Sequence, residues 1–185
     1  ASSMSEAGAN LIRMNYNLTE ENFQQVEISG GWIPPLCNSL DHLLAPTLPY
    51  LSSSLGHTLF VNIMKEATKK IEMLIRKTKF NLLGALRFDE DVRYLHSFCK
   101  ARLTIHTNDG DDDGDNEENF NTNANRTLEL MKKCEGLDRL AQISRILNVV
   151  EIEDLENLRG KGWKIKPQEI KGYLRLRVDL AFSWD

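Results

Sequence analysis

Seven carboxylates within ten residues form the part of the sequence that most resembles a metal site. Asp109, Asp111 and Asp113 occupy positions one, three and five of the EF-hand calcium loop, and a glycine follows at position six. Position twelve is Phe120, which cannot provide the bidentate carboxylate that completes the calcium shell. Clustered acids also repel one another, and the chain continues with asparagines rather than a helical pattern. We therefore predict a disordered acidic insertion over residues 105–125, with weak cation binding as the alternative.

The rest of the sequence contains no motif that predicts catalysis or metal binding. There is no GxSxG, glycine-rich phosphate loop or HExxH motif, and the cysteines and histidines lack ligand spacing. The segment LRGKGW at 158–163 has two glycines and a lysine but not the spacing of a phosphate loop. Asp89, Glu90 and Asp91 suit the start of a helix, where carboxylates cap backbone N–H groups. We predict a non-enzymatic protein with no cofactor and no small-molecule substrate.

Composition narrows the class of protein further. The chain has 185 residues, of which 41% are hydrophobic, so it is long enough for a substantial core. Its net charge is -4, but without the seven clustered acids the other 20 acids face 23 Lys and Arg residues. This small excess of positive charge outside the acidic run does not indicate a nucleic-acid binder. Cys37, Cys99 and Cys134 form no paired motif and are expected to be buried thiols in a reducing compartment.

Apolar residues recur at three- and four-residue steps, which is the helical period, and no stretch shows sustained alternation. Helices are expected over about 33–48, 51–79, 89–104, 126–148, 151–158 and 167–181, and Gly136 is expected to bend or break the fourth. No apolar run reaches the ~18 residues of a membrane span. We predict an all-α helical bundle. Its expected parts are a tail or fragment edge (1–32), N-terminal helices (33–104), the acidic insertion (105–125) and C-terminal helices (126–185).

Three blocks of sequence resemble one known family. The run KTKFNLLGALRFDEDVRYLHSF at 77–98 resembles the signature K-x-x-F-N-x-L-G-x-L-x-F-D-x-x-x-R-x-L, through Lys77, Phe80, Asn81, Leu83, Gly84, Leu86, Phe88, Asp89, Arg93 and Leu95. The second block, RLAQISRILNVVEIEDL, matches through Arg139, Leu140, Gln142, Ile146, Leu147 and Asn148. The third, WKIKPQEIKGYLRLRVDL, matches through Trp163, Ile165, Pro167, Glu169, Leu174, Leu176, Arg177, Val178 and Asp179. The family is the fourth subunit of the conserved oligomeric Golgi complex, near its C-terminus.

The resemblance implies a rod-like helical bundle within a vesicle-tethering complex that acts in intra-Golgi retrograde transport. It implies sister tether-complex subunits, SNARE proteins and Rab GTPases as partners, with no nucleic acid. It also implies a peripheral location on the cytosolic face of Golgi membranes. The acidic insertion departs from the family pattern and fits a lineage-specific, fungal insertion. Two alternatives stay open: a subunit of another multisubunit tether, exocyst-like or at the endoplasmic reticulum, and a cation-responsive regulator.

Two sites are predicted from charged residues. Arg139 and Glu169 lie in matched blocks, and a C-terminal helix that folds back onto the 137–148 helix would pair them. The alternative is two separately solvated charges. Lys65, Lys69 and Arg76 on the long helix form a candidate interaction surface for anionic lipid or an acidic SNARE face, with a solvated helix face as the alternative.

Overall fold

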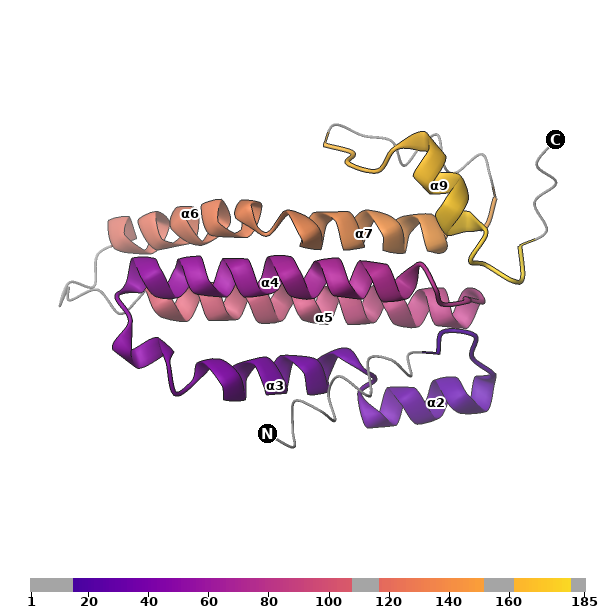
Figure 1. The fold of residues 1–185 in the computed structure, drawn as a ribbon, viewed down its shortest axis with the longest axis horizontal. Helices are drawn as coiled ribbons and strands as arrows, with labels where there is room; N and C mark the ends of the chain where they lie inside the picture. The colour runs from indigo at the N-terminus through magenta and orange to yellow at the C-terminus, as the bar shows by residue number, and fades with distance from the viewer. Residues whose placement is uncertain (1–14, 108–116, 152–161, 181–185) are drawn as a thin grey trace.

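The computed structural model describes residues 15–107, 117–151 and 162–180, and it confirms an all-α helical bundle. Its helices are α2 (Glu20–Ser29), α3 (Ile33–Leu44), the 3-10 turn η1 (Leu48–Tyr50), α4 (Ser53–Ile75), α5 (Leu82–Thr107), α6 (Glu117–Lys133), α7 (Glu135–Leu147) and α9 (Pro167–Leu174). The long helices α4 and α5 run side by side, with α2 and α3 along one side and α6 and α7 along the other (Figure 1). The short helix α9 packs against α7 at one end.

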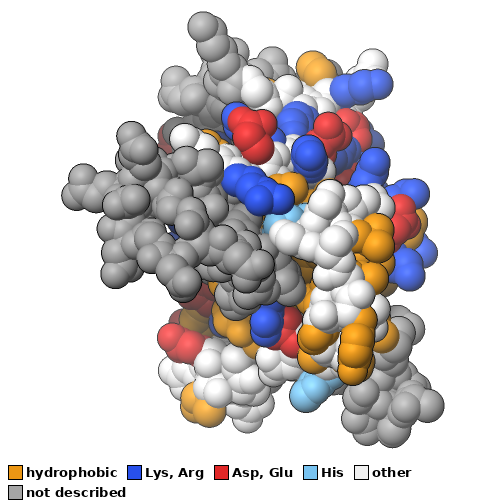
Figure 2. Space-filling view, turned by 90° about the vertical axis from the view of Figure 1, so that its left-hand side faces the viewer, with side chains coloured by type: hydrophobic (Ala, Val, Ile, Leu, Met, Phe, Trp, Pro, Cys, Tyr) orange, Lys and Arg blue, Asp and Glu red, His pale blue; other side chains and the backbone are white. Residues whose placement is uncertain are grey.

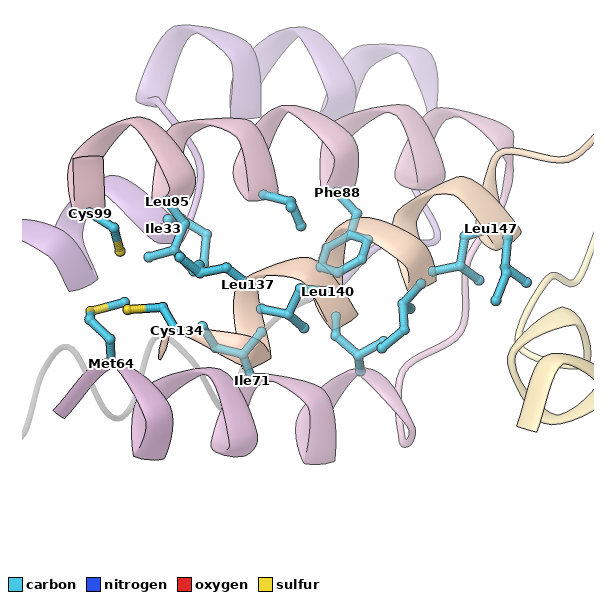
Figure 3. Packing of buried hydrophobic residues seen from close by; sticks show 14 of the residues in the cluster. Ile33, Met64, Ile71, Phe88, Leu95, Cys99, Cys134, Leu137, Leu140 and Leu147 are labelled. Atoms are coloured by element: carbon cyan, nitrogen blue, oxygen red, sulfur yellow. The ribbon is translucent and has the colours of Figure 1, made fainter. Parts of the chain in front are cut away.

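Most of the core consists of the apolar stripes of α3, α4, α5 and α7 (Figure 3), and α9 adds Ile170, Tyr173 and Leu174. The three cysteines are buried free thiols, as predicted. Burial raises the pKa of Cys134 to about 11 and that of Cys37 to about 12, so both remain protonated at neutral pH. No helix in the described ranges is long and apolar enough to cross a bilayer.

The chain breaks between α6 and α7 at Cys134, two residues before the glycine at which a break was expected. Gly136 has a different role, because it lies against α4. A Cβ atom at this position would be 2.0 Å from Thr68 Oγ1, a side chain that hydrogen-bonds back to Met64 O. The absence of a side chain therefore allows α7 to approach α4 closely.

Residues 1–32, assigned to a tail from the sequence, include an ordered helix and part of the core. Thr19 caps α2 by accepting a hydrogen bond from the Asn22 N–H, and Gly30 ends the helix with a φ of 79°. Tyr16 is fully buried, and its ring stacks on Phe80 at 4.8 Å. This contact joins positions 64 apart in the chain, so local periodicity could not indicate it.

The helices on either side of the acidic run extend further than predicted. Helix α5 continues to Thr107 and α6 begins at Glu117, so residues 105–107 and 117–125 are helical within the predicted insertion. Residues 108–116, which hold the first eight positions of the calcium-like motif, lie outside the described residues, as does most of the expected 151–158 helix.

Asp89 does not cap a helix, because α5 begins seven residues earlier, at Leu82. The cap is Asn81, whose side-chain oxygen accepts a hydrogen bond from the Gly84 N–H at 2.9 Å. Asp89 instead accepts a hydrogen bond from Ser144 at 2.7 Å and so joins α5 to α7. Asp91 lies in the core with 1% exposure.

The turn between α4 and α5 is held on both sides by segments from the two ends of the described chain. The Phe80 N–H donates to Leu176 O at 2.9 Å, and the Val178 N–H donates to Phe80 O at 2.8 Å. On the other side, the Asn81 N–H donates to Tyr16 O at 3.2 Å. We call this turn, residues 76–81, the Phe80 turn. Its hydrogen bonds position the segment that follows α9, at the end of the bundle that contains the candidate site.

Candidate functional site

A cluster of charged side chains lies where α4, α7 and α9 meet. It contains Glu72, Arg76, Arg139, Glu169 and Tyr173, and we call these five residues the ion cluster. Glu72 in α4 and Arg76 at its C-cap are four residues apart, as are Glu169 and Tyr173 in α9, so each pair lies on one face. Pro167 opens α9, and the Glu169 carboxylate accepts a hydrogen bond from the Lys166 N–H, which fixes the helix start.

Arg139 is the centre of the ion cluster. Its Nε and Nη2 atoms donate to the two carboxylate oxygens of Glu72 at 2.8 and 2.9 Å. Its Nη2 atom also lies 2.5 Å from Glu169 Oε1. The structure thus brings together the two residues that the sequence analysis paired, and it adds Glu72 as the bidentate partner.

Arg76 and Tyr173 complete the cluster. Arg76 Nη2 lies 2.8 Å from both Glu72 Oε1 and Glu169 Oε1. The Tyr173 hydroxyl donates to Glu72 Oε1 at 2.7 Å, and the Arg76 guanidinium lies 5.1 Å from the centre of the Tyr173 ring. Sequence reasoning missed Glu72 and Tyr173, although Tyr173 stands four residues after Glu169 on the same helical face.

The charges of the cluster balance, with two guanidinium groups against two carboxylates. Partial burial by itself raises the pKa of Glu72, but hydrogen bonds from Arg139, Tyr173 and Arg76 outweigh it and lower the pKa to about 2. The pKa of Glu169 is likewise lowered to about 2, because hydrogen bonds from Arg139, Lys166 N–H and Arg76 outweigh desolvation. Both carboxylates are therefore ionised and neutralised by arginine. The arrangement suits the attachment of α9 to the bundle rather than proton transfer.

The lowered pKa values predict a specific loss of stability in acid. Because Glu72 and Glu169 bind protons less readily in the folded chain, their stabilising effect is complete above pH 4.5 and is lost as the pH falls toward 2. We expect urea unfolding, measured at pH steps from 6 to 2.5, to show that the free energy of unfolding falls as the pH falls. The slope of this free energy against pH should be shallower in Glu72→Gln. Glu66→Gln, at an exposed position on α4, should keep the wild-type slope. Equal slopes in all three proteins would contradict this prediction.

The three cations proposed as one interaction surface do not lie in one site. Arg76 belongs to the ion cluster at the end of α4, while Lys65 and Lys69 are exposed on the preceding turns of that helix. Lys65 and Arg76 are eleven residues apart, which is about 16 Å along the axis. Binding of lipid or of an acidic protein by Lys65 and Lys69 stays a prediction.

A pocket of 340 Å³ lies beside the ion cluster, between the end of α4 and α9. We call it the α9 pocket, and it is lined by Arg76, Gln168, Glu169, Gly172, Tyr173 and Leu176. Five of these residues lie in the third sequence block that resembles the family, and two of them, Glu169 and Leu176, are matched positions, but the pocket itself was not predicted.

The opposite end of the bundle exposes apolar side chains. Leu43, Tyr50 and Leu55 lie at the end of α3, in η1 and at the start of α4, and Tyr50 is 89% exposed. Figure 2 shows this end of the molecule, where hydrophobic side chains reach the surface among polar ones.

A second polar network is buried between α5 and the N-terminal segment. The Tyr16 hydroxyl donates to Asp91 Oδ2 at 2.7 Å, and Arg87 Nη2 donates to Asp91 Oδ1 at 3.1 Å and to Gly30 O at 2.8 Å. Burial raises the pKa of Asp91 to about 6, although hydrogen bonds from Tyr16 and Arg87 oppose this shift. These contacts fasten the N-terminal segment to α5. In the part of the chain that the structure describes, no group of three His, Cys, Asp or Glu residues is arranged to hold a metal ion.

Comparison with known proteins gives a consistent result. The family model described as conserved oligomeric Golgi complex subunit 4, C-terminal, matches residues 7–172. A curated protein of that name from Arabidopsis thaliana is 23% identical over 171 residues, which cover 90% of this chain and 20% of the relative. The Drosophila melanogaster relative is 25% identical over 179 residues, and the Homo sapiens relative is 22% identical over 171 residues, with 93% and 90% of this chain covered. The chain spans about a fifth of the length of these relatives.

Proposed function

The chain belongs to the family of conserved oligomeric Golgi complex subunit 4, C-terminal, and from that premise we propose that it is a non-enzymatic part of a Golgi vesicle-tethering complex. The observation that carries the proposal is the family match over residues 7–172. Its proposed role is intra-Golgi retrograde transport, in which helical surfaces bind other proteins and no chemical step is catalysed. The ion cluster supports this role, because its carboxylates are neutralised within the fold and serve to hold α9 in place.

The proposed partners are the sister subunits of the tethering complex, SNARE proteins and Rab GTPases, at the cytosolic face of Golgi membranes. Membrane attachment would be peripheral, which agrees with the absence of a spanning helix among the described residues. In this mechanism the rigid bundle holds partner-binding surfaces at a defined place, and assembly of the complex determines where they act.

Affinity purification from a budding-yeast lysate tests the proposal. The tagged full-length subunit is compared with the same subunit lacking residues 15–180, and recovered proteins are identified by mass spectrometry. We expect sister Golgi-tether subunits with the complete protein, and Golgi SNAREs or Rab GTPases at reduced levels after the deletion. Recovery of subunits from a plasma-membrane or endoplasmic-reticulum tether instead would favour the alternative family role. Identical partner sets with and without the region would contradict a role in binding.

A further inference from the structure

The α9 pocket is lined by both apolar and charged side chains. Tyr173 and Leu176 contribute its apolar side chains, and the former is held in place by its hydrogen bond to Glu72. Gly172 leaves space in the wall, because a Cβ atom there would meet nothing within 4 Å. The pocket volume of 340 Å³ is large enough for one apolar side chain.

Arg76 gives the pocket a donor for a carboxylate. Its Nη2 and Nε atoms are occupied by Glu72 and Glu169, but its Nη1 atom makes no hydrogen bond within the described residues. The side chain of Arg76 is 46% exposed, so this edge can be reached from solvent. Guanidinium groups bind carboxylates with two donors in one plane, and such bonds are stronger than those between neutral groups.

The segments that border the pocket are strongly cationic. Residues 76–80 and 166–176 contain six basic residues and a single acid, Glu169, whose carboxylate is already bound to arginine. The basic residues are Arg76, Lys77, Lys79, Lys166, Lys171 and Arg175. The last five are exposed, and each is at most three positions along the chain from a residue that lines the pocket. The surroundings of the pocket thus favour a negatively charged ligand.

We infer that the α9 pocket binds an acidic segment of a partner protein, with one apolar side chain over Tyr173 and Leu176 and carboxylates against Arg76 and the bordering cations. A protein segment fits better than a membrane, because one side chain can enter a recess of 340 Å³ whereas a flat lipid surface cannot. The inference deepens the proposed function by naming the chemistry of one partner. It rests on the proposed function only where it assigns that partner to vesicle traffic.

The acidic run of this chain is not the occupant within one molecule. It joins the end of α5 to the start of α6, whereas the α9 pocket lies near the other end of α5. Helix α5 has 26 residues and so measures about 39 Å. A connection of nine residues that is anchored at both ends reaches at most about 18 Å from its anchors. The acidic run of the same molecule is therefore excluded as the ligand.

The test is selection of random twelve-residue peptides, displayed on phage, on the purified 185-residue chain. We expect enriched peptides to combine several acids with a leucine or aromatic residue. Their affinity should weaken when salt is raised from 0.05 to 0.5 M, because the Debye length falls from about 14 to about 4 Å. Gly172→Leu adds an apolar side chain to the pocket lining at a position where a Cβ atom meets nothing within 4 Å, and fluorescence anisotropy should show at least a tenfold loss of affinity for the enriched peptides. Lys77→Glu with Arg175→Glu should have a similar effect.

Lys100→Glu with Arg126→Glu is the matched charge control, because both residues are exposed and far from α9. This control should retain affinity within threefold, and thermal melting should show that Gly172→Leu remains folded. Enrichment without an acidic bias, no enrichment, or equal binding by Gly172→Leu would each overturn the inference. A different result would assign the pocket to lipid instead: no peptide is enriched, the wild-type chain sediments with phosphatidylserine vesicles, and Gly172→Leu abolishes this sedimentation. None of these results changes the outcome expected from purification of the full-length subunit.

Discussion

Replacing Arg139 by alanine is expected to lower the midpoint of thermal unfolding by about 5–10 °C. The change removes both bonds to Glu72 and the bond to Glu169, and it leaves two carboxylates near one another with only Arg76 between them. Breaking a fully buried pair costs about 3–5 kcal/mol. Because the Arg139 side chain is 23% exposed, we expect a loss of about 2–3 kcal/mol, which corresponds to that shift in a chain of this size.

Calorimetry with two further variants separates charge from geometry. Arg139→Lys keeps the charge but cannot bind Glu72 through two parallel donors, so it should lie between alanine and the wild type. Arg126→Ala, at an exposed position on α6, should leave the midpoint unchanged. A midpoint for Arg139→Ala within 1 °C of the wild type would show that the ion cluster does not hold α9 in place.

Replacing Gly84 by alanine is expected to destabilise the chain by about 3 kcal/mol, near the upper end of the usual effect of overpacking. A Cβ atom at Gly84 would lie 1.5 Å from the backbone oxygen of Tyr16, so no side-chain rotation can relieve the clash. The N-terminal segment would have to move away from α5. That movement would break the Tyr16 hydrogen bonds to Asn81 N–H and to Asp91.

Urea unfolding measures the loss, and near-ultraviolet circular dichroism reports on its location. The Trp32 ring packs edge-on against Tyr16 at 5.1 Å, so displacement of Tyr16 should reduce the aromatic signal. Gly172→Ala is the matched control, because its Cβ atom enters open space on a helix. It should be neutral or stabilising by up to about 1 kcal/mol. The prediction fails if the two variants have equal unfolding midpoints.

The predictions for Arg139 and Gly84 concern the two segments that bind the Phe80 turn from opposite sides. The Phe80 turn is bound by the N-terminal segment through Asn81 and by the segment after α9 through Leu176. The ion cluster then holds α9 itself against α4 and α7. Because the α9 pocket is formed by α4 and α9 together, loss of Arg139 should also weaken peptide binding there. Binding and stability are thus coupled at this end of the bundle.

The sequence by itself determined the fold class and part of the ion cluster. Helical periodicity is a local property, so the stripes of α4, α5 and α7 indicated an all-α bundle with buried cysteines. The blocks that resemble the family contained Arg139 and Glu169, and the assumption that the last helix folds back placed them together. Gly84 was also recognised as part of a block, but its spacing did not reveal what lies against it.

Only the tertiary structure decided which distant residues meet. Glu72 and Arg139 are separated by 67 positions, and Glu72 and Tyr173 by 101, so no local pattern joins them. The same reason explains why Tyr16 was assigned to a tail and Asp89 to a helix cap. Periodicity shows which face of a helix is buried, whereas the partner of a buried polar group depends on the angle and register at which helices pack. For this chain, that packing set Glu72 as the bidentate partner of Arg139 and opened the α9 pocket beside them.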